Sequence, residues 1–271
     1  MIKEKAYAKI NLALEVKDVV DGYHIVNNLM IPIDLYDEIT FEFSDKIELI
    51  NNPFPDNIIL KAAKLFIEKY KINSGVKMVL TKNIPSAAGL AGGSTDAAAT
   101  LKGLNKLFNN IATKEELLDM ASILGSDVPF FIDTKLALCV NRGEKVLPNN
   151  IKYIPFELLL LKPKLGLSTK DVYKNYDYDG HDYKEKIDNI FDALINNDID
   201  LLKKNIFNDL TKPALKLSND LNNTFNDIKN KSNIYLSGSG PTMFIINPTK
   251  EIENYIKNTY KDYFILHTKT L

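Results

Sequence analysis

The chain has 271 residues with a formal net charge of -1, and 45% of its residues are hydrophobic while 25% are charged. These values are typical of a globular protein with a sizeable core, in one large domain or two smaller ones. Lysine is mixed with acidic residues throughout, which disfavours nucleic acid as a partner. No apolar stretch approaches the ~20 residues of a membrane span, and no signal-peptide pattern follows Met1, so we expect a cytoplasmic protein without a membrane partner.

The first predicted element is a strand over residues 7–16, in which apolar and polar residues alternate. The alternation indicates one buried face and places Lys9 and Asn11 together on the other face. Two polar side chains at this spacing can converge on one ligand, and they can equally be solvated. The turn signal Asp21-Gly22-Tyr23-His24 comes next, followed by an apolar stretch over 25–35 and an alternating strand over 39–43.

Asn57 is a predicted helix N-cap, because apolar residues follow it at helical spacing. A strand over 76–80 leads into a glycine-rich loop, and helices are predicted over about 94–108 and 113–124. The second of these helices begins with a capping box at Thr113 and ends at Gly125. Strands over 136–140 and 145–147 complete this half of the chain. Cys139, the only cysteine, lies in the first of them, and we interpret it as a small buried hydrophobic residue.

We place a domain boundary near residue 150, which gives an N-terminal domain of residues 1–150 and a C-terminal domain of residues 151–271. The second domain begins with an apolar strand over 156–161, and helical patterns cover roughly 169–176, 183–196 and 213–230. The segment 234–236 leads into a second glycine-containing loop over 237–242. A strand over 243–246, a helix over 250–258 and a strand over 263–267 close the chain. His181 and His267 lie outside every motif, and we expect both at the surface.

The first glycine-rich loop runs from Pro85 to Ser94 and feeds a helix. Its glycines allow the backbone to approach a ligand closely, and a helix N-terminus favours an anion, so the loop is a candidate phosphate cradle. An ordinary turn before a core helix explains the glycines equally well. Neither the Walker phosphate loop nor the Gly-x-Gly-x-x-Gly pattern of dinucleotide folds is present. The glycine spacing alone therefore leaves both interpretations open.

Motifs spread over the whole chain, from Lys5 to beyond Phe244, carry a resemblance to a known family. They are Lys9-Ile10-Asn11-Leu12, Asp21-Gly22-Tyr23-His24, the loop over 85–94, Gly125-Ser126-Asp127-Val128-Pro129-Phe130-Phe131, and Ser237-Gly238-Ser239-Gly240-Pro241-Thr242. Together they resemble the signature motifs of the GHMP kinases, and in detail the branch that acts on a cytidine-diphosphate derivative of methylerythritol. Ala91 stands where the family usually has glycine, and Thr95 where a second serine is common. The methyl group of Ala91 matters if that position needs a positive φ.

The resemblance implies the two-domain α+β fold of the GHMP kinases, with the active site in the cleft between the domains. It also implies that Lys9 and Asp127 are the catalytic pair. Asp127 would accept a hydrogen bond from the substrate's C2 hydroxyl, and Lys9 would stabilise the negative charge that develops there. How far Asp127 acts as a true base stays open, because a loose transition state demands little deprotonation. Taken alone, Lys9 is equally a solvated lysine and Asp127 a helix N-cap.

The resemblance implies ATP and Mg²⁺, with the metal arriving on the nucleotide. The ATP-binding residues it implies are Asn57, Pro85, Ser86, Ala87, Ala88, Gly89, Leu90, Ala91, Gly92, Gly93, Ser94 and Thr95, and Ser94 is also the candidate metal ligand. The substrate-binding residues it implies are Asn11, Tyr23, His24, Thr169, Tyr173, Gly238 and Ser239. Tyr23 and Tyr173 would stack on the two faces of cytosine while His24 hydrogen-bonds its edge. A core role explains Tyr173 as well.

Two other functions stay open from the sequence. One is a GHMP kinase that acts on a small alcohol such as homoserine or mevalonate, and the other is a non-catalytic nucleotide-binding protein on the same scaffold. Tyr23 and His24 disfavour the first, because a small alcohol offers no base to stack. Lys9 and Asp127 disfavour the second. The expected partner is a small cytidine-diphosphate sugar alcohol, and we expect a monomer or a homodimer.

Overall fold

The computed structural model describes residues 1–20, 22–51, 56–178 and 180–271. A seven-stranded sheet follows the order β3-β4-β2-β1-β8, with β5 pairing with β2 and β6 pairing with β5. The pairs β3–β4 and β1–β8 are parallel, and the others are antiparallel. The strands of this sheet are β1 (Ile2–Val20), β2 (Tyr23–Ser44), β3 (Glu48–Ile50), β4 (Gly75–Thr81), β5 (Ala137–Val140), β6 (Lys145–Pro148) and β8 (Phe207–Asn208).

A four-stranded antiparallel sheet of order β11-β7-β10-β9 forms the other end of the molecule. Its strands are β7 (Glu157–Lys162), β9 (Tyr235–Leu236), β10 (Met243–Ile246) and β11 (Phe264–Lys269). The strands before residue 150 belong to the first sheet. The strands after it belong to the second sheet, except β8, which pairs with β1 of the first. The domain boundary itself stays a prediction.

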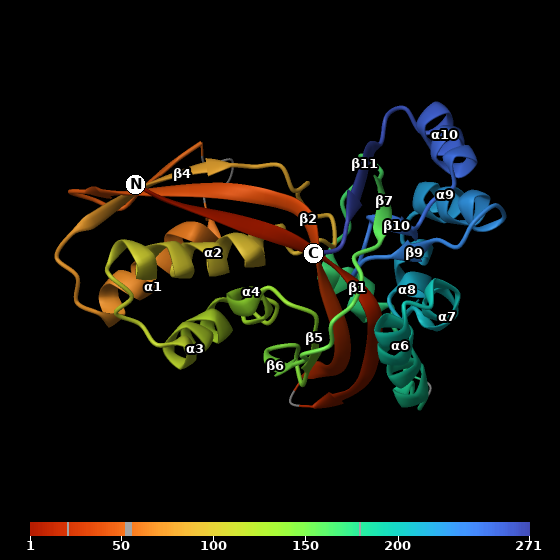
Figure 1. The fold of residues 1–271 in the computed structure, drawn as a ribbon, viewed down its shortest axis with the longest axis horizontal. Coiled ribbons are helices and arrows are strands. Elements are labelled where there is room, and N and C mark those ends of the chain that lie inside the picture. Colours follow the sequence, from red (N-terminus) through yellow and green to blue (C-terminus); the bar gives the residue numbers. More distant parts are fainter. Residues whose placement is uncertain (21, 52–55, 179) are drawn as a thin grey trace.

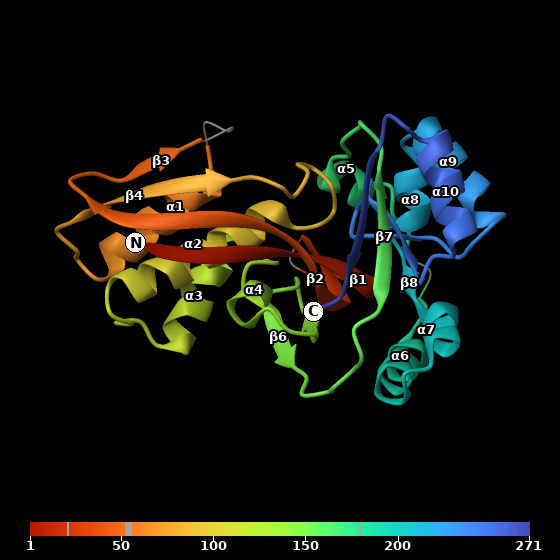
Figure 2. The same cartoon turned by 45° about the horizontal axis from the view of Figure 1, so that its top comes forward.

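Helices cover both sheets. The helices are α1 (Ile58–Lys69), α2 (Gly92–Leu107), α3 (Lys114–Leu124), α4 (Phe130–Asp133), α5 (Thr169–Lys174), α6 (Lys184–Asn196), α7 (Ile199–Asn205), α8 (Thr211–Lys216), α9 (Asn219–Lys229) and α10 (Lys250–Thr259). Figure 1 shows α1, α2 and α3 gathered on one side of the first sheet, at the end of the molecule away from the second sheet. Helices α8, α9 and α10 lie at the opposite end, beyond the second sheet, as the turned view in Figure 2 also shows. In the part of the chain that is described, no helix combines the length and apolarity needed to cross a membrane.

The long hairpin of β1 and β2 joins the two halves. Ala8, Ile10 and Leu12 of β1 share a core cluster with Leu158 and Leu160 of β7, so one face of the hairpin packs against the second half. The prediction of a single buried face in β1 was wrong, because the opposite face is buried as well. That face therefore holds its polar side chains inside the protein, where each needs a partner.

Local sequence signals fix the helices of the first half. The side chain of Asn57 accepts a hydrogen bond from the backbone N–H of Ile59, and Thr113 forms the predicted capping box with Glu116. Helix α2 packs closely on β2, since a Cβ at Gly103 would lie 2.2 Å from the ring of Phe41. The caps fix the starts of α1 and α3, and the close contact at Gly103 holds α2 against the sheet.

Several predicted elements differ from the structure. The helix predicted over 213–230 is two helices, because the backbone becomes extended at Ser218, whose side chain caps the second helix. The stretches 25–35 and 39–43 form one strand, β2, and α7 was missed. His181 is only partly exposed, because its Nε2 lies 2.9 Å from Oδ2 of Asp209. His267 is exposed and Cys139 is buried, as predicted.

Candidate active site

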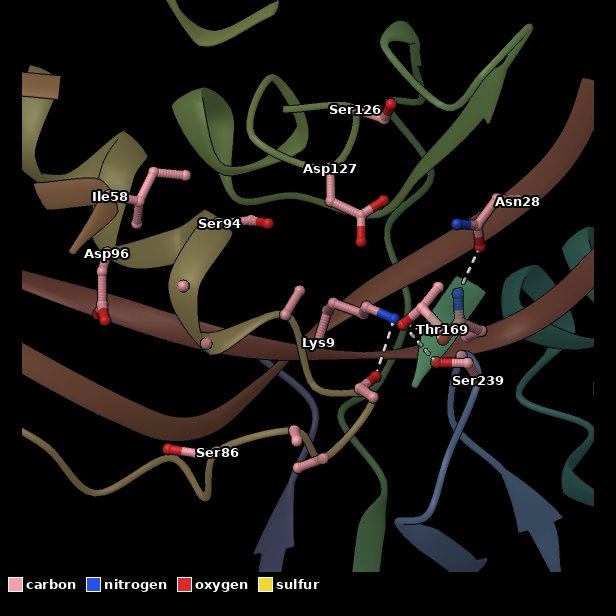
Figure 3. A pocket seen from close by; sticks show the side chains of 18 of the residues that line it. Lys9, Asn28, Ile58, Ser86, Ser94, Asp96, Ser126, Asp127, Thr169 and Ser239 are labelled. Atoms are coloured by element: carbon pink, nitrogen blue, oxygen red, sulfur yellow. Dashed lines mark hydrogen bonds between the residues drawn. The ribbon is translucent and has the colours of Figure 1, made fainter. Parts of the chain in front are cut away.

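One large cavity, of about 920 Å³, lies where the β1–β2 hairpin, the loop before α2, the turn before α4 and the loop after β9 meet. Figure 3 shows side chains from these segments reaching into it. Because segments from both halves of the chain line the same space, the cavity is a cleft between the two halves.

Lys9 lies on the inner face of β1 and is only 3% exposed. Its ammonium donates hydrogen bonds to Oδ1 of Asn11 at 2.7 Å and to the carbonyl oxygen of Gly89 at 3.0 Å. Asn11 in turn donates to Oδ1 of Asn28 at 2.5 Å. Burial lowers the pKa of Lys9, and the negative charge of Asp127 opposes that shift. The interpretation of Lys9 as a solvated lysine was therefore wrong.

Asp127 lies in the turn between α3 and α4 and is half-buried. It does not cap α4, whose N-cap is Pro129 and has no side-chain hydrogen bond. Among the described residues, the Asp127 carboxylate has neither a hydrogen bond nor an ion pair, so its oxygens are free to bind a ligand. Figure 3 shows this carboxylate directed toward the Lys9 ammonium across the cavity. The two groups thus face one space with opposite charges.

The two glycine-containing loops pack against each other beside Lys9. Gly89 has φ +74°, and a Cβ there would lie 2.1 Å from the carbonyl oxygen of Ser237. The Ser237 hydroxyl donates to the carbonyl oxygen of Gly89 at 3.0 Å, and the N–H of Thr242 donates to the carbonyl oxygen of Ala88 at 3.2 Å. Only glycine fits position 89, because both the left-handed backbone and the close contact exclude a side chain.

Helix α2 begins at Gly92, two residues before the predicted start, and Ala91 is its N-cap. Ala91 has φ 58° and ψ 33°, which is the left-handed conformation, and its carbonyl oxygen accepts from the N–H of Thr95 at 3.0 Å. The sequence left open whether this position needs a positive φ, and the structure shows that it adopts one. The first N–H groups of α2 lack partners within the helix and lie at the cavity, as an anion-binding helix terminus requires.

A cluster of three charged residues, Asp37, Lys82 and Asp96, supports the start of this loop, and sequence reasoning missed it. Oδ1 of Asp37 accepts from the backbone N–H groups of Asn83 at 2.5 Å and Ile84 at 2.7 Å. Lys82 is ion-paired with Asp37 and, at 2.7 Å, with Asp96. Asp37 is fully buried, and burial raises the pKa of Asp96 to about 7. The cluster joins the start of the candidate phosphate loop to Asp37 of β2, which is 45 residues away from Lys82 in the sequence.

Aromatic side chains gather at the other end of the cavity. The His24 and Tyr173 rings lie 5.2 Å apart between centroids, and the guanidinium carbon of Arg142 lies 4.8 Å from the centroid of Tyr23. Tyr23 is 56% exposed, whereas burial raises the pKa of Tyr173 above its usual value. The hydroxyls of Thr169 and Ser239 lie 2.9 Å apart. Nδ1 of His24 is buried and has no hydrogen-bond partner among the described residues, which leaves it available to a ligand.

Nearly all of the predicted site residues line this one cavity. They are Lys9, Asn11, Tyr23, His24, Asn57, Pro85, Ser86, Ala87, Ala88, Gly89, Ala91, Gly92, Gly93, Ser94, Asp127, Thr169, Tyr173, Gly238 and Ser239. Leu90 and Thr95 are not among the lining residues, because both side chains are buried behind the wall. The lining residues that the sequence did not indicate include Asn28, Lys82, Asp96 and Arg142.

Oxygen donors on the first turns of α2 suit a magnesium ion that arrives with a nucleotide. Ser94 lines the cavity, and Oδ1 of the buried Asp96 has no hydrogen-bond partner in the described structure. Mg²⁺ is commonly held by one or two carboxylates together with substrate phosphates and water. Within the described ranges, no group of three His, Cys, Asp or Glu residues could hold an ion without such help. The donor set therefore fits a metal that shares its coordination with phosphate oxygens.

Known proteins resemble this chain over its whole length. Residues 57–135 match the family described as GHMP kinases N terminal domain. A 4-diphosphocytidyl-2-C-methyl-D-erythritol kinase of Clostridium beijerinckii is 41% identical, over 98% of this chain and 100% of the relative. The enzyme of the same name from Clostridium perfringens is 38% identical, over 100% of this chain and 98% of the relative.

Solved structures resemble the fold. A 4-(cytidine 5'-diphospho)-2C-methyl-D-erythritol kinase matches with a TM-score of 0.84 and 27% identity, covering 99% of each chain. A homoserine kinase from Cytophaga hutchinsonii matches with a TM-score of 0.69 and 18% identity, covering 100% of this chain and 94% of its own. At that identity the second likeness concerns the fold alone.

Replacing Ala91 with glycine should stabilise the protein. A left-handed conformation strains alanine and not glycine, so we expect Ala91→Gly to raise the free energy of unfolding by up to about 1 kcal/mol. Ala97→Gly, at a right-handed position of the same helix, should lower it by about 1 kcal/mol or more. Urea unfolding measures both values. A loss of stability in Ala91→Gly equal to that in Ala97→Gly would contradict the assignment of strain.

The raised pKa of Asp96 predicts a pH-dependent contribution to stability. The folded protein retains a proton on Asp96 up to about pH 7, whereas the usual value for Asp is 3.8, so this contribution is lost as pH rises through 7. Asp96→Asn cannot titrate. We expect the free energy of unfolding of the wild type, minus that of Asp96→Asn, to fall by on the order of 2 kcal/mol between pH 5 and pH 8. A difference that stays constant or rises over that range would contradict the buried-carboxyl explanation.

Proposed function

The chain belongs to the 4-diphosphocytidyl-2-C-methyl-D-erythritol kinases of the GHMP kinase family, and we propose that its cavity transfers the γ-phosphoryl group of ATP to the C2 hydroxyl of 4-diphosphocytidyl-2-C-methyl-D-erythritol. Membership confirms the predicted α+β fold and an ATP-dependent small-molecule kinase in isoprenoid precursor synthesis. The observation that carries the residue assignment is the placement of Lys9 and Asp127 in one cavity, between a helix N-terminus and a group of aromatic rings.

The N-terminal end of α2 suits the triphosphate of ATP. The loop over 85–93 supplies backbone N–H groups and the positive end of the helix dipole, which together favour phosphate oxygens. Ser94 would hold Mg²⁺ there with those phosphates, and Asp96 would add a carboxylate oxygen once it has lost its proton. The metal, when bound, neutralises part of the phosphate charge. Asn57, at the N-terminus of α1, lines the same end of the cavity and is proposed to contact the nucleotide.

Asp127 and Lys9 act at the reacting oxygen. The Asp127 carboxylate accepts a hydrogen bond from the C2 hydroxyl and takes its proton as the bond from that oxygen to the γ-phosphorus forms. The bond from the γ-phosphorus to the β,γ-bridging oxygen breaks, and ADP leaves. The Lys9 ammonium stabilises negative charge on the attacking oxygen. Its bonds to Asn11 and Gly89 orient it in advance, so little reorganisation is needed during the reaction.

The aromatic end of the cavity is proposed to bind the cytidine. Tyr23 and Tyr173 offer ring faces for the pyrimidine, and the unpartnered Nδ1 of His24 can hydrogen-bond its edge. Thr169, Gly238 and Ser239 line the wall beside Lys9 and Asn11, where the sugar alcohol would lie. A cytoplasmic location and a monomeric or homodimeric state remain predictions from the sequence.

Assays with three alternative substrates, each added separately, test the proposed reaction. Purified protein with ATP and Mg²⁺ should release ADP when 4-diphosphocytidyl-2-C-methyl-D-erythritol is added, and a phosphorus NMR spectrum should show a new phosphomonoester. Homoserine and mevalonate should give no ADP above the background. Turnover of either alcohol without turnover of the cytidyl compound would reject the proposed substrate and favour another GHMP activity. Tight ATP binding without turnover of any of them would favour a non-catalytic protein.

Removing the Asp127 charge should abolish most of the turnover. Asp127→Asn keeps the shape of the side chain and loses the proton acceptor, so we expect kcat to fall by about 10²- to 10⁴-fold. The control is Asp133→Asn. Asp133 lies at the end of α4, and its carboxylate is ion-paired with the exposed Lys114. The kcat of this control should stay within about twofold of the wild type, since surface pairs contribute little. Wild-type kcat in Asp127→Asn would show that the assignment is wrong.

A further inference from the structure

Arg142 is the only arginine among the 34 lysine and arginine residues of the chain, and it lines the cavity. It lies in the turn between β5 and β6, where the sequence analysis found no functional motif. Arginine differs from lysine in its planar guanidinium, which stacks on aromatic rings and binds two oxygens of a phosphate at once. A chain that uses lysine almost everywhere therefore places its single planar cation at this cavity.

The turn that carries Arg142 is fixed on both sides. The carbonyl oxygen of Asn141 accepts a hydrogen bond from the N–H of Val26 at 2.7 Å, which ties the turn to β2 close to Tyr23 and His24. Gly143 has φ +102°, and a Cβ there would lie 3.8 Å from Oδ1 of Asp127. Arg142 thus sits between the aromatic end of the cavity and the proposed catalytic carboxylate.

Among the described residues, Arg142 is a cavity cation with neither a hydrogen bond nor an ion pair. Lys9 is held by Asn11 and Gly89, and Lys82 lies between two carboxylates. Arg142 is exposed, and among the described residues it pairs with no carboxylate. Its guanidinium carbon lies over the Tyr23 ring, 4.8 Å from the ring centroid, in a cation–π contact. This contact orients the guanidinium without neutralising it, so the charge remains available for an anion in the cavity.

We propose that the Arg142 guanidinium binds the diphosphate bridge of the cytidyl substrate, a proposal that rests on the function proposed above. With the base at Tyr23 and the C2 hydroxyl at Asp127, the diphosphate must cross the space between them, where Arg142 is fixed. The bridge carries two negative charges, while Lys9 serves the reacting oxygen and the N-terminus of α2 serves ATP. Arg142 supplies a cation for this bridge and selects a cytidine diphosphate over a cytidine without phosphates.

The affinities for CDP and cytidine test the proposal, with isothermal titration as the measurement. Wild-type protein should bind CDP more tightly than cytidine. Arg142→Met should weaken CDP binding about 10- to 100-fold, the scale of hydrogen bonds to charged groups. It should weaken cytidine binding no more than about threefold, the scale of one lost cation–π contact. Arg142→Lys should recover only part of the CDP affinity, because an ammonium lacks the fork and the planar stack.

Turnover separates a binding role from a structural one. In Arg142→Met, the KM for the cytidyl substrate should rise by a factor similar to that for CDP, whereas kcat and the KM for ATP should stay within about twofold. The matched control is Lys145→Met, which removes an exposed positive charge from the same hairpin. Its CDP affinity should equal that of the wild type. An equal loss in both variants would assign the effect to the general field of the protein and overturn the proposal.

Two further results would overturn it, and they differ from a failure of the proposed function. Arg142→Met that keeps the wild-type ratio of CDP to cytidine affinity would show that Arg142 does not contact the diphosphate, even while the wild type turns over its cytidyl substrate. Equal affinities of the wild-type protein for CDP and for cytidine would also show that Arg142 does not contact the diphosphate. Absence of wild-type turnover with the cytidyl substrate would instead reject the function on which the proposal rests. Circular dichroism of each variant confirms that it is folded.

Discussion

The carbonyl oxygen of Gly89 holds the centre of the molecule together. It accepts hydrogen bonds from the Lys9 ammonium and from the Ser237 hydroxyl, each at 3.0 Å. Three segments that are far apart in the sequence, β1, the loop before α2 and the loop after β9, therefore meet at one atom. A partly buried carbonyl with two such donors is fully satisfied, and losing either donor would remove a partner from a polar group that is shielded from water. The relative position of Lys9, the proposed catalytic lysine, and the candidate phosphate loop depends on this contact.

Lys9 is buried because both faces of the β1–β2 hairpin are covered. One face packs against β7 and its neighbours, and the other carries Lys9 and Asn11 into the cavity. A lysine held in a low-dielectric space interacts more strongly with a nearby negative charge than a solvated lysine does. The same burial lowers its pKa, and the opposite charge of Asp127 limits that change. Burial in the hairpin thus removes water from the Lys9 ammonium and strengthens its field at the oxygen that is proposed to react.

Local signals in the sequence predicted most helices, and the family resemblance supplied the expected site residues. Contacts between distant segments account for what was missed. Asn57 and Thr113 cap their helices through bonds to residues two and three positions away, which a sequence displays directly. The role of Lys82 depends on Asp37, whose position in the fold no local pattern reveals. The two buried faces of β1 could not be read from its alternation either, since polar side chains on a strand normally indicate solvent.

Gly89 and Ala91 show why one departure from the family pattern is tolerated in this loop. Both residues adopt positive φ, so local backbone strain alone would favour glycine at each. At position 89 a Cβ would collide with the carbonyl oxygen of Ser237 at 2.1 Å, and that contact cannot relax without separating the two loops. The Ala91 methyl is accommodated beside the core of the first half. A methyl group at 91 therefore costs only conformational strain, whereas at 89 it would displace the loop from Lys9 and the site would lose its geometry.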